Sequence, residues 1–147
     1  MRFLRVCSLS ILTLSLVVLA SAGPALAQNQ QATTKITIPG EDRFVPFAVT
    51  VKVGTKVEWV NNDTEGHYLV SNSKFNTAGH KNVNMLIPAG GKVSLVFNQV
   101  GVFPFYCSLH SMLDADHQPK APGPAGGIQD QNGNYGTPMN GVVTVVK

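Results

Sequence analysis

Charged side chains are scarce in this sequence, making up 13% of its 147 residues. The basic residues are scattered and form no Lys/Arg cluster that could neutralise a row of phosphates, which excludes nucleic acid as a partner. Two of the eleven, Arg2 and Arg5, lie in the first five positions, so nine basic residues face eight acidic ones over the rest of the chain. That near-balance gives no indication of a strongly charged partner.

Long apolar runs are missing, apart from "VCSLSILTLSLVVLASA" at residues 6–22. It follows the two arginines and precedes the small-residue triplet Ala25-Leu26-Ala27. This order predicts a secretory signal peptide over residues 1–27, cleaved after Ala27, and hence a periplasmic or secreted protein. A membrane anchor is the alternative, although the run is short for a span and is followed by Gly23-Pro24. Once the leader is removed, we expect no membrane association.

Cysteine is nearly absent as well. Cys7 lies in the predicted leader, which leaves Cys107 as the only cysteine of the mature chain. An exported protein with one cysteine has no internal disulfide. A lone thiol in an oxidising compartment is also open to oxidation unless it is buried or bound. The presence of Cys107 therefore needs an explanation.

No segment repeats its apolar residues with the period of a long helix, whereas Val, Thr and Gly are plentiful. Short alternating segments bounded by turn residues recur about every ten positions, which is typical of an all-β domain. We predict a Greek-key β-sandwich or barrel of seven to eight antiparallel strands. The expected strands fall within residues 35–39, 44–53, 55–63, 67–71, 84–87, 92–97, 101–107 and 141–147.

The chain is long enough for a single domain. We predict a loose N-terminal tail at residues 28–34 and one domain at residues 35–147. Residues 71–84 show no clear period and are expected to form a loop with at most one helical turn. Residues 111–138 are rich in Pro, Gly, Asn and Asp and form a long insertion before the last strand, and loops of this length are usually functional or mobile. The expected core includes Phe47, Trp59, Phe97 and Phe105.

Metal-ligating side chains gather at the end of one predicted strand. Cys107 and His110 have the spacing C-x2-H, and His67 lies 40 residues earlier, at the start of another strand. A thiolate, two imidazoles and a distant thioether are the ligands that favour copper in an electron-transfer site. Copper binding would also protect the lone thiol. The other reading is that Cys107 is a small buried apolar residue.

These residues stand in two ordered blocks. The first is "FVPFAVTVKVGTKVEWVNND" at residues 44–63, followed by His67; the second is "GVFPFYCSLH" at residues 101–110, followed by "MNGVVTV" at residues 139–145. The chain resembles the cupredoxins, the small blue copper proteins, over roughly residues 35–147. The resemblance implies a Greek-key sandwich and a single copper ion held by His67, Cys107 and His110. It also implies one-electron transfer.

The axial ligand is where the sequence departs from the family. Relatives have a methionine two to four residues after the second histidine, followed by x-Gly and the last strand. Here Met112 comes too early, whereas Met139 has the right context but follows the insertion. Because the last strand should pair with the strand that ends at Cys107, its first residues must return to the site. We therefore favour Met139, with Met112 or a site without methionine as alternatives.

Several expectations follow from the resemblance. The second histidine of relatives lies near the surface, so Leu109, Met112 and Leu113 around His110 would form an apolar patch for transient contact with a redox partner, a cytochrome or a copper or amine oxidoreductase. Asn62 would brace the loop before His67. We expect the protein to be a monomer. We also expect it not to be an enzyme, because the histidine clusters of multicopper oxidases and the second cysteine of a dinuclear copper site are absent. A copper carrier without electron transfer is the alternative function.

Overall fold

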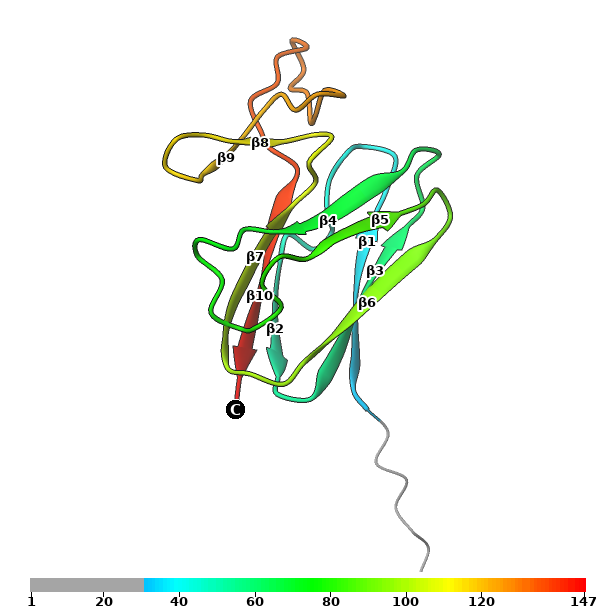
Figure 1. The fold of residues 1–147 in the computed structure, drawn as a ribbon. Helices are drawn as coiled ribbons and strands as arrows, with labels where there is room; N and C mark the ends of the chain where they lie inside the picture. Colours follow the sequence, from blue (N-terminus) through cyan, green and yellow to red (C-terminus); the bar gives the residue numbers. More distant parts are fainter. Residues whose placement is uncertain (1–30) are drawn as a thin grey trace, which may run out of the picture.

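The computed structural model describes residues 31–147, so the predicted signal peptide and residues 28–30 of the predicted tail lie outside the described part. In that range the chain forms ten strands and no helix (Figure 1). The described residues therefore include no helix long and apolar enough to cross a membrane. Residues 71–84 contain no helical turn. The strands are β1 (Thr33–Ile38), β2 (Ala48–Lys52), β3 (Thr55–Asn61), β4 (His67–Ser71), β5 (Asn84–Ile87), β6 (Lys92–Phe97), β7 (Gly101–Tyr106), β8 (Met112–Leu113), β9 (Pro119–Lys120) and β10 (Asn140–Val146).

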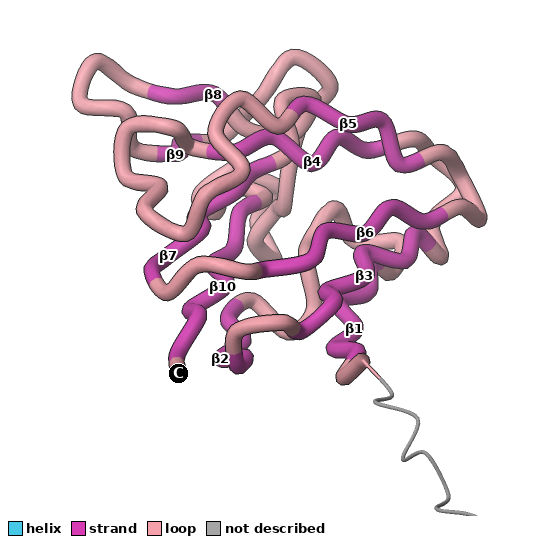
Figure 2. Tube along the Cα trace, turned by 60° about the horizontal axis from the view of Figure 1, so that its bottom comes forward, coloured by secondary structure: helices cyan, strands magenta, loops and turns pink. Residues whose placement is uncertain are grey.

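Two sheets form the body of the molecule. One has the strand order β1-β3-β6 and the other β2-β10-β7-β4-β5, while β8 and β9 pair separately within the insertion (Figure 2). The predicted all-β sandwich is thus confirmed. The sheets are mixed rather than purely antiparallel, because β1 pairs with β3 and β2 with β10 in parallel. Both parallel pairs arise because the chain changes sheet between β1 and β2 and again between β2 and β3.

The core lies between the two sheets and is rich in aromatic residues. Alternation along β3 turns Trp59 inward, and β7 turns Phe103 and Phe105 toward it from the facing sheet. The Trp59 ring lies 6.2 Å from Phe103 and 5.4 Å from Phe105, both edge to face. Burying each such side chain contributes about 1.5–3 kcal/mol, so these contacts hold β3 and β7 together.

Phe47 does not belong to this core, contrary to the prediction. It precedes the edge strand β2 and is 57% exposed. Along β2 only Val51 is fully buried, although the sequence alternates apolar residues through the whole segment. β2 is an edge strand with a neighbour on one side only, and Phe47 lies before its first residue. At such a position, alternation of apolar and polar residues does not by itself ensure that the apolar side chain is buried.

The topology brings three chain segments to one end of the sandwich. β7 pairs antiparallel with both β4 and β10, and its end lies beside the start of β10 and the end of β4. The start of β4 therefore extends past β7 and reaches Cys107, whose sulfur accepts the N–H of Tyr68. Asn140 is opposite Tyr106, as expected from the requirement that the last strand return to the Cys107 strand. The insertion projects from this same end, above β7 and β10 (Figure 1).

Candidate metal centre

Three metal-ligating side chains meet at that end. His67 is the first residue of β4, Cys107 directly follows β7, and His110 lies one tight turn later, with its N–H donating to the Cys107 carbonyl at 3.2 Å. The Nδ1 atoms of the two histidines are 3.2 Å apart, and the Cys107 sulfur lies 3.9 Å from Nδ1 of His67 and 3.5 Å from Nδ1 of His110. All three side chains are at most 1% exposed. The structure therefore brings together the three residues that the sequence singled out.

The donor set suits a soft or borderline transition metal. One thiol and two imidazole nitrogens converge from three sides on a point shielded from solvent. Burial raises the pKa of the Cys107 thiol, but hydrogen bonds from the His110 ring and from backbone N–H groups, including that of Tyr68 at 3.3 Å, outweigh it. The pKa of Cys107 therefore lies below its ordinary value, which favours the thiolate that a metal needs. These residues fit copper.

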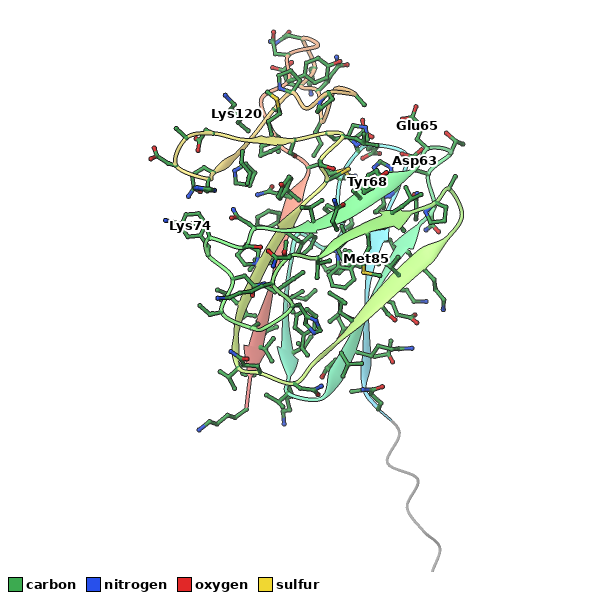
Figure 3. The ribbon with its side chains drawn as sticks, in the orientation of Figure 1. Asp63, Glu65, Tyr68, Lys74, Met85 and Lys120 are labelled. Atoms are coloured by element: carbon green, nitrogen blue, oxygen red, sulfur yellow. The ribbon has the colours of Figure 1, made fainter. Side chains whose placement is uncertain are left out.

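Each histidine also faces a carboxylate with its outer ring nitrogen. Nε2 of His67 lies 3.1 Å from Asp63, and Nε2 of His110 lies 3.4 Å from Asp42. Figure 3 shows Asp63 toward the end of the molecule from which the insertion projects. A carboxylate on the outer nitrogen holds a proton there, so Nδ1 is the nitrogen that can bind a metal once its own proton has left. The two aspartates thus fix the ring orientation that metal binding requires.

Charge interactions in the centre act in a consistent direction. Burial lowers the pKa of His110, but its contact with the Cys107 thiolate and the charge of Asp42 outweigh that effect and raise it. Burial raises the pKa of Asp63, but the hydrogen bond with His67 and backbone N–H donors lower it below the ordinary value. Sequence analysis did not single out either aspartate. Only Asp63 could have been noticed from its position, because it lies four residues before His67.

Asn61, and not its neighbour Asn62, braces the loop that leads to His67. The Asn61 side chain is fully buried at the end of β3, whereas Asn62 is exposed. Its amide donates to the carbonyl of Glu65 at 2.7 Å, and its oxygen accepts the N–H of Asp63 at 2.9 Å. The predicted bracing role therefore belongs one position earlier, because the side chain that points into the sandwich is the one with the inward phase of β3.

The two candidate axial methionines lie in different surroundings. Met139 directly precedes β10 and is fully buried, and its carbonyl accepts the N–H of Cys107 at 2.9 Å. The Ser111 hydroxyl donates to the same carbonyl at 3.0 Å. Met112 lies in β8 and is 44% exposed. Met139 is thus tied to the backbone of the centre, while Met112 belongs to the surface of the insertion.

His110 is 1% exposed, which contradicts the expectation that it lies near the surface within an apolar patch. Residues 121–127 of the insertion, called here the covering segment, lie against it. A Cβ atom at Gly123 would overlap the backbone of Leu109 and Ser111, and one at Gly127 would lie 2.9 Å from the His110 carbonyl oxygen. The covering segment therefore packs on the backbone of the turn that carries His110.

The other two histidines stand apart from this group. Nε2 of His80 lies 2.8 Å from the carbonyl oxygen of Val96, and His117 is exposed in the insertion. The carbonyl of His117 accepts a hydrogen bond from the buried Asn72 side chain at 2.7 Å. Neither ring belongs to the metal-ligating group found among residues 31–147.

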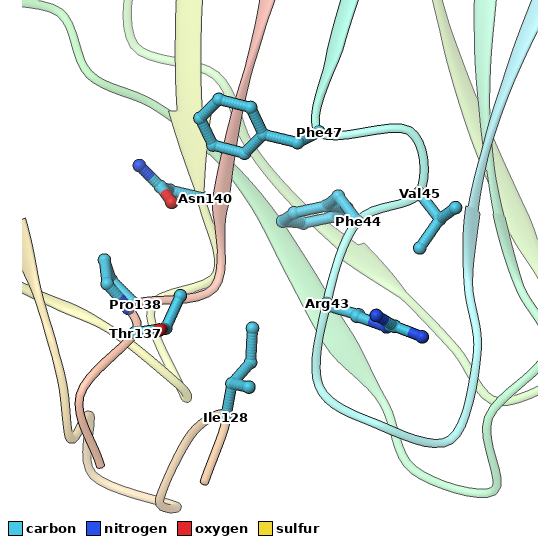
Figure 4. A pocket seen from close by; sticks show the side chains of 8 residues that line it. All are labelled: Arg43, Phe44, Val45, Phe47, Ile128, Thr137, Pro138 and Asn140. Atoms are coloured by element: carbon cyan, nitrogen blue, oxygen red, sulfur yellow. The ribbon is translucent and has the colours of Figure 1, made fainter. Parts of the chain in front are cut away.

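A hollow of about 420 Å³ opens beside the centre, between the segment before β2 and the end of the insertion. Figure 4 shows Phe44 and Phe47 on one side and Ile128 and Pro138 on the other. Pro138 and Asn140, the chain neighbours of Met139, line the hollow, whereas Met139 itself does not. Sequence reasoning had no signal for it, because the two walls are far apart in the sequence.

Comparison with known proteins adds a family and a fold. Residues 31–115 match the family model described as copper binding proteins, plastocyanin/azurin family. Plastocyanin of Nostoc punctiforme is 31% identical over 121 residues, a match that covers 73% of this chain and 86% of that protein.

Solved structures of amicyanin share the fold. An oxidised methionine-to-leucine variant of amicyanin aligns with a TM-score of 0.52 at 18% identity, covering 76% of this chain and 80% of the other. Amicyanin from Paracoccus versutus aligns with a TM-score of 0.50 at 18% identity, covering 80% and 83%. At these identities the likeness concerns the arrangement of the strands.

Proposed function

Because this chain belongs to the plastocyanin/azurin family of copper-binding proteins, the cupredoxins, we propose that it is a carrier of single electrons with one copper ion as its cofactor. The observation that carries the proposal is the buried group of His67, Cys107 and His110, with the sulfur 3.5–3.9 Å from both Nδ1 atoms. A thiolate with two imidazoles is the donor set of electron-transfer copper sites.

The proposed ligands are these three residues together with Met139 in the axial position. Burial of Met139 and the hydrogen bond from Cys107 N–H to its carbonyl support this choice over the exposed Met112. When bound, copper supplies a one-electron couple between Cu(II) and Cu(I). A centre with a fixed ligand set does not need to rearrange when an electron arrives or leaves.

The surrounding residues hold that geometry. Asp63 and Asp42 keep the outer nitrogens of the histidines occupied, and Asn61 ties down the loop that carries Asp63. The N–H of Tyr68 donates to the Cys107 sulfur, and hydrogen bonds to a ligating sulfur tune the redox potential. Exclusion of water by the surrounding strands and the insertion keeps these interactions strong.

We further propose export, transient contact with a protein redox partner, and a monomeric state. Export rests on the signal-peptide pattern of residues 1–27. Transient contact is the mode typical of redox proteins, whose contact areas are small. The buried ligands also make the alternative role, handing copper to an acceptor protein, less favourable, because each transfer would have to open the centre.

The decisive experiment is the visible and EPR spectrum of the copper form, with voltammetry on the same sample. We expect an intense thiolate-to-Cu(II) absorption and a reversible one-electron wave, and Cys107→Ala should abolish both. A colourless Cu(II) complex, or colour that survives in Cys107→Ala, contradicts the proposal. Copper transfer to an acceptor without a reversible wave would instead support the carrier function.

The axial ligand has its own matched pair of variants. Met139→Leu should change the spectrum and shift the potential, because it removes the thioether while keeping the buried volume. Met112→Leu, at the exposed position, should leave both unchanged. A change only in Met112→Leu would reverse the assignment, and no change in either would mean a site without methionine.

A further inference from the structure

The covering segment, residues 121–127, is built to lie directly on the backbone of the metal-centre turn. The N–H of Ala125 donates to the carbonyl of Leu109 at 2.8 Å. Gly123 lies so close to Leu109 and Ser111 that a Cβ atom there would overlap their backbone atoms. Five of the seven covering residues are Gly or Pro, and the sequence here, "APGPAGG", contains only small or cyclic side chains. Gly127 is buried. Backbone, rather than long side chains, therefore closes this edge of the centre.

The segment is also fixed in shape. Gly123 and Gly126 exchange two backbone hydrogen bonds, with N–H to carbonyl distances of 2.7 Å and 3.1 Å, which close a tight turn above the metal centre. Below it, β8 and β9 pair with each other, and the insertion is attached to the body through the bond from Asn72 to the His117 carbonyl. A turn closed on itself and bonded to Leu109 behaves as part of the folded body rather than as a free loop.

Asp42 closes the same edge from the opposite side. It lies in the turn after β1, 30% exposed, with its carboxylate 3.4 Å from Nε2 of His110. The outer nitrogen of His110 thus faces protein on this side too, and the ring is 1% exposed in total. Asp42 thus faces the imidazole itself, while the covering segment packs on the backbone of the turn that carries it.

We propose that the covering segment is a specificity determinant that keeps other molecules from the His110 edge of the centre. A second copy of this chain, or a redox protein, that approaches over His110 meets the backbone of residues 121–127 instead of the imidazole. Small outside ligands are excluded in the same way. Electron exchange between two copies is then slow, because one electron must pass from the reduced to the oxidised copy across two covering segments. This last consequence rests on the proposed electron-carrier function; the closure itself does not.

The closure is tested by solvent hydrogen exchange at the ring N–H of His110, followed by NMR on the full chain loaded with Cu(I), which is diamagnetic. We expect a visible, slowly exchanging resonance for His110, whereas the ring of the exposed His117 exchanges too quickly to be seen. Exchange at His110 as rapid as at His117 in the unaltered protein overturns the proposal, whatever any variant does.

Two glycine variants within the insertion separate the cover from a general effect of mutation. Gly123→Ala places a methyl group against the metal-centre turn, while Gly136→Ala places it in open space. We expect Gly123→Ala to speed exchange at His110 at least about tenfold, equivalent to about 1.4 kcal/mol of weakened closure. Gly136→Ala should match the unaltered protein. Equal exchange rates in both variants would show that Asp42 and the body protect the ring without the cover.

Electron exchange between copies is measured on the same samples from line broadening in mixtures of reduced and oxidised protein. We expect a slow rate for the unaltered protein and Gly136→Ala, and a rate at least about tenfold higher for Gly123→Ala, following the open population. The specificity role is overturned if the His110 ring is protected from hydrogen exchange in the unaltered protein but electron exchange is equally slow in Gly123→Ala. If no reversible copper couple exists, the electron-carrier function fails, and hydrogen exchange in the metal-free chain still decides whether the edge is closed.

Discussion

Replacing Asn61 with alanine tests whether the loop before His67 is held by one buried side chain. Asn61 is fully buried, and its amide and oxygen serve four backbone groups. The amide donates toward the carbonyls of Glu65, Ile87 and Pro88 at 2.7, 3.1 and 3.2 Å, and the oxygen accepts the Asp63 N–H at 2.9 Å. Alanine removes all of these contacts and leaves their partners in the interior.

The magnitude follows from how many bonds the amide can make. Two N–H groups shared among three carbonyls, plus one accepted bond, amount to three hydrogen bonds. At a net contribution of about 0.5–1.5 kcal/mol each, Asn61→Ala should lower the free energy of unfolding by about 1.5–4.5 kcal/mol. That is a large part of the roughly 5–15 kcal/mol expected for a whole domain.

Urea unfolding of the metal-free chain is the assay, with Asn62→Ala as the matched control. The control removes the same side chain from an exposed neighbour and should change stability by no more than about 0.5 kcal/mol. The midpoint of Asn61→Ala should fall by more than about 1 M urea with an unchanged slope. Equal midpoints for the two variants would refute the bracing role. Copper affinity should also fall roughly 10- to 100-fold in Asn61→Ala, because the loop holds Asp63 against His67, a proposed ligand.

Three further predictions concern charge, packing and the metal. Hydrogen bonds with Lys56 and Lys92 lower the pKa of Glu58 below its ordinary value of 4.5, so its stabilising effect is present above that pH and is lost as pH falls through the folded-state pKa. The difference in the free energy of unfolding between the metal-free chain and Glu58→Gln, measured in urea, should therefore shrink on acidification. A difference that does not depend on pH would contradict this. Gly141→Ala should cost about 1–3 kcal/mol in thermal or urea unfolding, because its Cβ would lie 2.6 Å from the Phe105 ring, whereas Gly136→Ala should be nearly neutral. Copper at a hundred times its dissociation constant should raise the free energy of unfolding by about 2.7 kcal/mol, and Cys107→Ala should lose this gain.

The fold was accessible from the sequence because its signals are local. Alternation along 55–61 and 101–106, with turn residues between segments, is enough to predict short strands and a sandwich. The return of Met139 to Cys107 also followed, since adjacent antiparallel strands must begin and end together. Burial at a sheet edge did not follow, and Phe47 is the clearest example. Its alternation matches that of Val51, but only the facing sheet decides which of them is covered.

The choice between Asn61 and Asn62 shows the same limit at the level of one residue. Asn61 is the last residue of β3 and Asn62 follows it, and either could brace a loop on chemical grounds. The phase of β3 against the opposite sheet places one inside and the other outside. A sequence shows that side chains alternate along a strand, but it shows less securely which of the last residues face the core. At a strand end the backbone is no longer paired with the neighbouring strand, so the alternation is less strictly kept.

By itself, the sequence determined the strand pattern, the close pairing of Cys107 with His110 in one turn, and the chemistry of a thiolate with two imidazoles. Only the tertiary structure decided that Asp42 faces His110 and that residues 121–127 pack on the turn that carries it. These contacts join segments separated by many residues and depend on packing between loops, whose sequences carry no period. Ligand chemistry is thus written in short motifs, whereas access to the ligands is set by long-range contacts.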